Sequence, residues 1–256
     1  MLCAFIAGGV PRLLPAARTG SSAQHGAQCS RRPRTPTVLC SATPSVSPAC
    51  VVARDSLLSS IRGTGRGVES PAETTAAVME AIDTLVDACA GHQGDDGGDW
   101  VNRLAGRWRL LFSTETGLTA LMGGRLPLVS AADVYQLVEN GGALKNVVEF
   151  SRTSTADSTP VRSADSPNPA PAGSLIVSVE AVPNAAAAPV RRMDFVFRRT
   201  GVRWGATGGF DLPFAVGRGH FDVLHLDEAL RVDRDANGWV NVYAYDGPAT
   251  RCTVGG

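Results

Sequence analysis

The first 54 residues contain no aspartate or glutamate, and this absence separates them from the rest of the chain. All 24 acidic residues of the 256-residue sequence lie at or after Asp55. The same stretch has no lysine, but it carries six arginines and ten serines and threonines. An N-terminus that is rich in Arg and Ser and free of acid is typical of an organelle transit peptide. We therefore predict that residues 1–53 are a disordered chloroplast transit peptide.

Two other interpretations of residues 1–53 stay open at this point. Composition alone does not distinguish a plastid transit peptide from a mitochondrial one. A disordered tail that is not a targeting signal would have a similar composition. A secretory signal is disfavoured, because Met1–Val10 offers only a short apolar stretch without a basic start.

After residue 53 the chain has no excess of positive charge. It keeps 19 basic and 24 acidic residues, which gives a formal charge of −5. This balance argues against a nucleic-acid partner and against attachment to anionic lipid by charge. No run approaches the roughly 20 apolar residues that a membrane-spanning helix needs. Contact with lipid is therefore expected to be peripheral or inside a pocket.

Motifs of metal sites and common enzymes are also missing. Only Cys89 and Cys252 follow residue 54, and no Cys-x-x-Cys pair exists, so neither a disulfide framework nor a zinc site is expected. Cys89 is predicted to be a small buried residue on a helix. The sequence lacks a Gly-x-Ser-x-Gly elbow and a phosphate-binding loop. His220 and His225 would point to opposite faces of a strand. We predict no metal and no cofactor.

Two helices are predicted between residues 55 and 91. Asp55 is placed to cap a short helix from Ser56 to Ile61. Ser70 and Glu73 have the spacing of a capping box at the start of the second helix. An apolar stripe with a period near 3.6 residues then follows; its members are Val78, Ile82, Leu85, Val86 and Cys89.

From Trp100 onward the apolar residues recur with a period of two. This alternation predicts about seven short antiparallel strands that close into a barrel or sandwich. The segments are Trp108–Phe112, Val134–Val138, Asn146–Phe150, Leu175–Val179, Met193–Phe197, Leu224–Val232 and Val240–Ala244. Strands and helices do not alternate, which argues against a nucleotide-binding parallel sheet. Residues 151–173, rich in Ser, Pro, Ala and Asp, are predicted to be a disordered insert.

Aromatic side chains on these strands would either fill the barrel or line a cavity for an apolar ligand. The candidates are Trp108, Tyr135, Phe150, Phe195 and Phe197. Asp227 is the most specific polar signal; it would pair with Arg231, stand at the barrel mouth, or hold a turn. Asp227 and His225 share a strand face. They would supply the acid/base group if the protein were an enzyme.

Three motifs carry a resemblance to a known family. They are Leu104–Thr114 (LAGRWRLLFST), the pair Val134–Gln136 and Asn146–Phe150, and Leu224–Asp227 followed by Leu230–Arg234 and Gly238. In this order, from about Leu57 to Tyr243, the chain resembles the plastid lipid-associated protein (fibrillin) family. It departs from the pattern at His225, where the family has an aromatic residue, and at Asp235, where it has glycine.

The resemblance implies a mainly β protein: a lipocalin-like antiparallel barrel over 100–245, preceded by helices in 55–91. The family domain would span 54–247, with a tail over 248–256. The implied function is non-enzymatic binding or sequestration of carotenoids, prenylquinones or fatty acids at plastoglobules or thylakoids, beside a prenyl-lipid enzyme partner. An enzyme of plastid isoprenoid or lipid metabolism, or an accessory partner of one, is the alternative. The expected ligand contacts are Trp108, Tyr135, Phe150, Phe195, Phe197, Asp227 and Arg231.

Overall fold

The fold was obtained as a computed structural model, which describes residues 47–90, 100–123, 129–140, 142–152, 173–204, 208–212 and 217–249. Residues 1–46 of the predicted transit peptide (1–53) lie outside these residues, as do most of the predicted insert and the end of the tail. The described residues form a β-barrel with helices packed on its outside.

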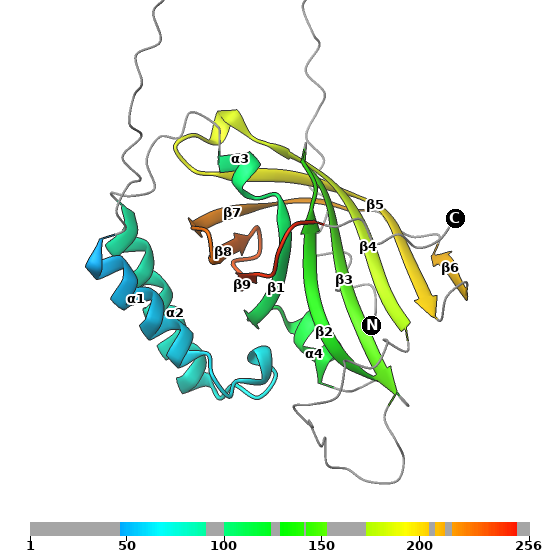
Figure 1. The fold of residues 1–256 in the computed structure, drawn as a ribbon, viewed down its shortest axis with the longest axis horizontal. Helices are drawn as coiled ribbons and strands as arrows, with labels where there is room; N and C mark the ends of the chain where they lie inside the picture. The colour runs from blue at the N-terminus through cyan, green and yellow to red at the C-terminus, as the bar shows by residue number, and fades with distance from the viewer. Residues whose placement is uncertain are drawn as a thin grey trace, which may run out of the picture.

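An antiparallel barrel forms the body of the protein, as the sequence predicted (Figure 1). Its strands, in chain order, are β1 (Gly106–Ser113), β2 (Val129–Val138), β3 (Ala143–Arg152), β4 (Gly173–Pro183), β5 (Arg192–Trp204), β6 (Gly208–Leu212), β7 (Arg218–Leu226), β8 (Leu230–Asp235) and β9 (Val240–Tyr245). The hydrogen-bonded order is β4-β3-β2-β1-β9-β8-β7-β5-β6, and an additional β4–β5 pairing closes the ring. Within the described part of the chain, eight strands make the barrel, and β6 extends it beyond β5.

The segment Leu224–Val232, predicted as one strand, is a hairpin of two strands. Asp227 interrupts it, because its Oδ1 accepts hydrogen bonds from the backbone N–H groups of Ala229 and Leu230, each at 2.7 Å. A side chain that bonds its own backbone two and three residues ahead makes a tight turn. Asp227 is therefore the turn aspartate that the sequence left as one of three alternatives.

The first helix starts earlier than predicted. Helix α1 spans Pro48–Ser60, and the hydroxyl of its N-cap residue Ser47 accepts a hydrogen bond from Cys50 N at 3.1 Å. Serine followed by proline is a favoured helix start. Composition had assigned this segment to the leader, which is why the prediction placed the cap at Asp55.

Helix α2 spans Ala72–Cys89, and its N-cap is Pro71 without a side-chain hydrogen bond. The predicted capping box at Ser70 was therefore wrong, while the predicted stripe is buried at Val78, Ile82, Leu85 and Cys89. Cys89 forms a disulfide with Cys50 of α1. No disulfide was expected from the sequence, because Cys50 had been assigned to the leader and 39 residues separate it from Cys89.

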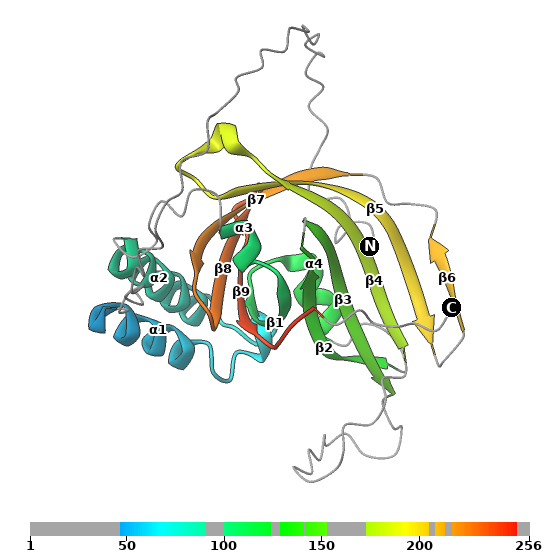
Figure 2. The ribbon, with the colours of Figure 1, turned by 45° about the horizontal axis from the view of Figure 1, so that its top comes forward.

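Apolar side chains of the described residues form two main cores on opposite sides of the barrel wall. One core fills the barrel interior and includes Trp108, Val148 and Phe221. The other lies between α1, α2 and the outer face of β1, β8 and β9, where Phe112, Leu230 and Val232 are its contacts. Figure 2 shows α1 and α2 side by side along this part of the wall.

Smaller elements complete the fold. Helix α3 (Trp100–Arg103) precedes β1, and helix α4 (Thr116–Met122) follows it and adds Leu118 to the interior core. A 3-10 turn at Ala185–Ala187 connects β4 to β5. On the β5–β6 hairpin, Trp204 and Phe210 make an edge-on ring contact with 5.6 Å between their centroids.

Candidate functional site

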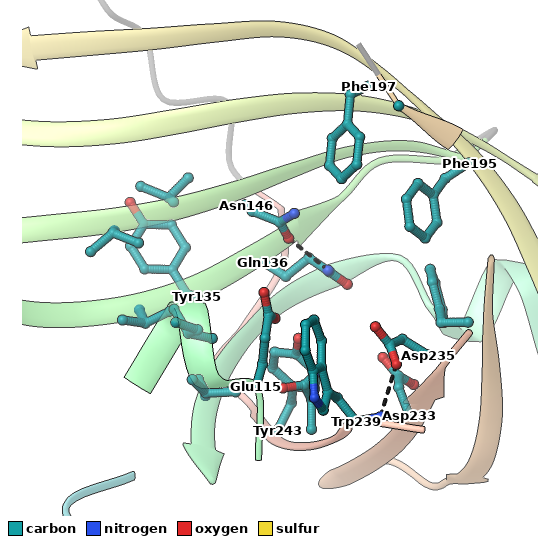
Figure 3. A pocket seen from close by; sticks show the side chains of 18 of the residues that line it. Glu115, Tyr135, Gln136, Asn146, Phe195, Phe197, Asp233, Asp235, Trp239 and Tyr243 are labelled. Carbon is teal, nitrogen blue, oxygen red and sulfur yellow. Dashed lines mark hydrogen bonds between the residues drawn. The ribbon is translucent and has the colours of Figure 1, made fainter. Parts of the chain in front are cut away.

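A cavity of about 130 Å³ lies inside the barrel (Figure 3). Pockets that enclose a whole drug-sized ligand usually measure roughly 300–1,000 Å³. The barrel is therefore partly hollow, with room for the head group or for one segment of a lipid. The lining comes from α4 with its preceding loop, from β1–β3, β5 and β7–β9, and from the β8–β9 turn: Leu110, Glu115, Leu118, Val134, Tyr135, Gln136, Asn146, Val147, Val148, Phe195, Phe197, Gly217, Arg218, Phe221, Asp233, Asp235, Trp239, Asn241 and Tyr243.

One wall of the cavity is apolar. Phe195 and Phe197 project from β5 into the space, with ring centroids 5.2 Å apart and nearly perpendicular planes (Figure 3). The ring centroid of Phe221, in β7, lies 6.2 Å from that of Phe195. Such aromatic contacts give a stable apolar surface at low entropic cost, because the rings hold one another in place.

The opposite wall is polar and acidic. Glu115, Asp233, Asp235 and Trp239 face the space from this side (Figure 3), together with Asn241. Strand geometry explains this arrangement, because successive side chains point to opposite faces. The apolar residues of β8 and β9 point outward to the helices, so their polar neighbours must point inward; the outward residues are Leu230, Val232, Val240 and Val242.

Arg231 is the charged group behind this polar wall, and its residue is 0 % exposed. Its Nε lies 3.1 Å from Asp233 Oδ2, and its Nη2 donates to Gln136 Oε1. The guanidinium carbon also lies 4.4 Å from the ring centroid of Tyr243 and 5.1 Å from that of Trp108. A buried guanidinium needs such partners, because an unpaired charge in the interior is very costly.

Burial raises the pKa of two carboxyl groups in the polar wall. The pKa of Glu115 rises to about 7, because burial and then the nearby charge of Asp235 disfavour its ionised form. Burial raises the pKa of Asp233 to about 6, although the charge and hydrogen bonding of Arg231 oppose the increase. Both carboxyl groups therefore titrate between mildly acidic and neutral pH rather than near pH 4.

We expect the free energy of unfolding to fall by about 3–4 kcal/mol from pH 5 to pH 8, at about 1.4 kcal/mol per pKa unit. The folded pKa values of Glu115 and Asp233 exceed the ordinary values of 4.5 and 3.8, so the folded state binds more protons in this window. That stabilisation is lost as the pH rises through the folded values. Urea unfolding at pH 5, 6.5 and 8 measures the effect.

Glu115→Gln is the matched variant for the pH series, and it should flatten the part of the profile between pH 5 and pH 7. Below pH 4 the trend should reverse. Burial acts to raise the pKa of Asp227, but bonds from His225, Ala229 and Leu230 outweigh it and lower the pKa to about 2. Stability that rises steadily from pH 5 to pH 8 would contradict the assignment of Glu115 and Asp233.

Three of the predicted ligand contacts, Tyr135, Phe195 and Phe197, line the cavity. Trp108 belongs to the interior core, where its Nε1 donates to Leu104 O at 2.8 Å, and it is not a lining residue. Phe150 packs against the same core without lining the space. Arg231 does not line the cavity, but it is ion-paired with Asp233, which does.

Tyr135 borders the cavity, but its side chain is engaged on the other face of β2. Its hydroxyl donates to Glu149 at 2.7 Å, and the guanidinium carbon of Arg107 lies 3.9 Å from the ring centroid. Tyr135 packs in a separate small cluster with Leu137 and Val147. The structure therefore does not place this ring in the barrel interior, where the sequence had predicted it.

Asp227 and His225 lie outside the cavity lining. His225 Nε2 is 3.1 Å from Asp227 Oδ2, which confirms that the two side chains share a face. Arg54 of α1 also approaches Asp227, with Nη1 3.6 Å from Oδ2. This acid/base pair therefore lies at the turn between β7 and β8, next to α1 and outside the lining of the cavity.

Sequence reasoning missed the polar wall, namely Glu115, Asp233, Asp235, Trp239, Asn241 and Tyr243. One signal could have found part of it. Arg231, Asp233 and Asp235 alternate with Leu230, Val232 and Arg234, so one face of β8 is wholly polar and the other begins with two apolar residues. Alternation alone assigns the apolar face to the barrel interior, and only knowledge of the covering helices reverses the assignment.

Among the described residues, no group of three His, Cys, Asp or Glu side chains could hold a metal ion. None of the helices described is long and apolar enough to cross a membrane. Neither observation decides what enters the cavity, so the site is defined by its shape and by its two walls.

Comparison with known proteins gives one match. The PAP_fibrillin family model matches residues 52–167, which include α1 from its fifth residue, α2 and the strands β1–β3. No curated protein and no solved structure matches the chain. The match covers the first two motifs of the resemblance and ends before the third. Residues 52–167 of the chain therefore match the PAP/fibrillin family, which supports the family resemblance that the motifs indicated.

Proposed function

We propose that this protein is a non-enzymatic plastid lipid-associated protein that holds one end of an apolar lipid inside its barrel. The observation that carries the proposal is the cavity with one aromatic and one polar wall. Lipid sites combine a large apolar surface with a few polar groups that fix the orientation of the ligand. The volume of about 130 Å³ suits the head and first segment of a carotenoid, prenylquinone or fatty acid, with the remaining chain outside.

Plastid location is part of the same proposal. The PAP/fibrillin family and the acid-free N-terminus both support it. In this proposal the leader ends before Ser47, because a cut at residue 53 would remove Cys50 and with it the disulfide to α2. A prenyl-lipid enzyme as partner is a further part of the proposal.

Association with a plastoglobule or thylakoid surface is a second proposed role. Trp204 is 47 % exposed and Phe210 is 51 % exposed, and neither lines the cavity. Exposed aromatic side chains at the tip of a protein commonly enter the boundary between lipid head groups and acyl chains. The β5–β6 hairpin would be the point of contact.

One experiment tests both roles with a crossed pair of variants. The full-length protein is mixed with galactolipid vesicles that contain a prenylquinone. Flotation then measures surface attachment, and mass spectrometry after gel filtration measures the lipid that the protein retains. Phe197→Asp should lose retained lipid but still float, because an unpaired carboxylate in the aromatic wall is costly to bury. Trp204→Ser should float poorly but still retain lipid.

Circular dichroism must first show that each variant is folded. If the parent protein retains no lipid and takes none up from a plastid extract, the cavity is not a lipid site. Turnover of an added lipid by the parent would instead promote the alternative of an enzyme in plastid isoprenoid or lipid metabolism.

A further inference from the structure

The polar wall contains hydrogen-bond acceptors that no group in the described part of the chain uses. Asp233 Oδ1 and Asn241 Oδ1 are both buried and accept no hydrogen bond. Both residues line the cavity, and they stand opposite each other in the β8–β9 ladder. Buried polar atoms are almost always paired, so two unpaired neighbours of the same kind point to a bound group.

Two nearby donors, Arg231 Nη2 and Gln136 Nε2, are committed to other atoms. Arg231 is ion-paired with the second oxygen of Asp233 and donates to Gln136 Oε1. Gln136 Nε2 in turn donates to Asn146 Oδ1 at 2.8 Å. Arg231 Nη1 is also unpaired, but Arg231 is not a lining residue. The wall therefore offers a ligand two acceptors side by side.

We propose that Asp233 and Asn241 recognise a hydroxyl group, so that the cavity prefers an apolar ligand with an alcohol or phenol head. The same skeleton with a carbonyl or carboxylate head should bind more weakly. This inference rests on the proposed function and names the chemistry of its ligand.

Each competing head group is expected to bind more weakly for a separate reason. An aldehyde or quinone carbonyl is only an acceptor, so it would leave both protein acceptors unpaired. A carboxylate would add negative charge beside Asp233, Glu115 and Asp235, which outnumber Arg218, the basic residue of the cavity lining. The raised pKa values of Glu115 and Asp233 show that this wall already disfavours negative charge. A hydroxyl is neutral and donates one hydrogen bond, so it satisfies one of the two acceptors, Asp233 Oδ1 or Asn241 Oδ1.

Three probes with one carbon skeleton test the preference: farnesol, farnesal and farnesoate, titrated calorimetrically into the full-length protein. We expect farnesol to bind at least about tenfold more tightly than farnesal, since sites that bond a ligand hydroxyl discriminate strongly against analogues without one. Farnesoate should bind most weakly of the three.

Two variants locate the effect. Asn241→Leu removes one acceptor and should reduce the preference for farnesol severalfold. Asp233→Asn keeps the shape; its amide oxygen stays with Arg231, so the amide nitrogen replaces Oδ1 and donates into the cavity. This variant should bind farnesal more tightly than the parent does. Thr200→Val is the matched control, because Thr200 Oγ1 is also buried and unpaired but does not line the cavity.

The outcomes separate the two proposals. A tenfold preference that Asp233→Asn reverses and Thr200→Val retains would support hydroxyl recognition. Equal binding of farnesol and farnesal by the parent would overturn it, while lipid binding itself would stand. Binding of none of the probes, together with failure to retain any plastid lipid, would overturn both. If Asn241→Leu does not fold, the isosteric variant Asp233→Asn still tests whether the cavity recognises a hydroxyl group.

Discussion

Trp108→Ala is expected to lower the free energy of unfolding by about 3–5 kcal/mol, the usual cost of removing a large aromatic side chain from a core. Trp108 is 1 % exposed and belongs to the core of the barrel interior. Truncation would leave a cavity that the rigid strands cannot close. It would also leave the carbonyl of Leu104 without the hydrogen bond that Trp108 Nε1 now donates at 2.8 Å.

Two further contacts would be lost with this ring. Tyr245 of β9 packs edge-on against it at 5.2 Å between centroids, and the guanidinium of Arg231 lies 5.1 Å from its centroid. Trp108 thus joins the apolar core to the charged pair behind the cavity. Because Tyr245 and Arg231 would also lose these contacts, the decrease in the free energy of unfolding should lie in the upper part of the range given above.

Urea unfolding of parent and variant measures the change, and a thermal melt should fall by more than about 6 °C. Trp204→Ala is the matched control, since Trp204 is 47 % exposed and its truncation should cost far less. A Trp108→Ala protein that melts within a degree or two of the parent would show that this ring does not support the barrel.

The inward face of Trp108 was readable from sequence, although not its absence from the cavity lining, whereas the face of Tyr135 was not readable. In β1, Trp108 and Leu110 alternate with Arg107 and Arg109, so the polarity of the strand assigns its faces. In β2 both faces are apolar: Val134 points one way, and Tyr135 and Leu137 point the other. Alternation then predicts a strand but leaves open which side faces the interior.

The polar wall and the disulfide depended on contacts between distant segments. The inward direction of Asp233 follows from α1 and α2, which cover the apolar residues of β8 from outside. Cys50 lies in a segment whose composition matches a leader, and its partner is 39 residues away. Local patterns contain no information about such pairings, so the barrel could be predicted and the chemistry of its interior could not.

Arg231→Met is expected to destabilise the protein by about 3–5 kcal/mol at pH 8, the cost typical of leaving one member of a buried ion pair alone. The side chain of Asp233 is 5 % exposed, and Arg231 is its ion-pair partner. The substitution keeps much of the length and apolar bulk of the side chain, so the loss reports on charge. Gln136 Oε1 would also lose the hydrogen bond that Arg231 donates.

Protonation of Asp233 limits this cost and gives the prediction its test. The pKa of Asp233 is already raised to about 6 with Arg231 present, and the loss of a positive neighbour must raise it further. At pH 5 the carboxyl group of the variant should therefore be neutral. The destabilisation measured at pH 5 should be smaller than at pH 8 by at least about 1 kcal/mol.

The double variant Arg231→Met/Asp233→Leu separates the ion pair from the packing. Replacing both members of a buried pair with apolar residues is often neutral or stabilising. We expect urea unfolding at pH 8 to show the double variant closer to the parent than Arg231→Met alone. If the two variants were equally unstable, and if the deficit did not change between pH 5 and pH 8, the ion pair would not be what stabilises this wall. The packing of Arg231 between the rings of Trp108 and Tyr243 would then be the main source of its stability.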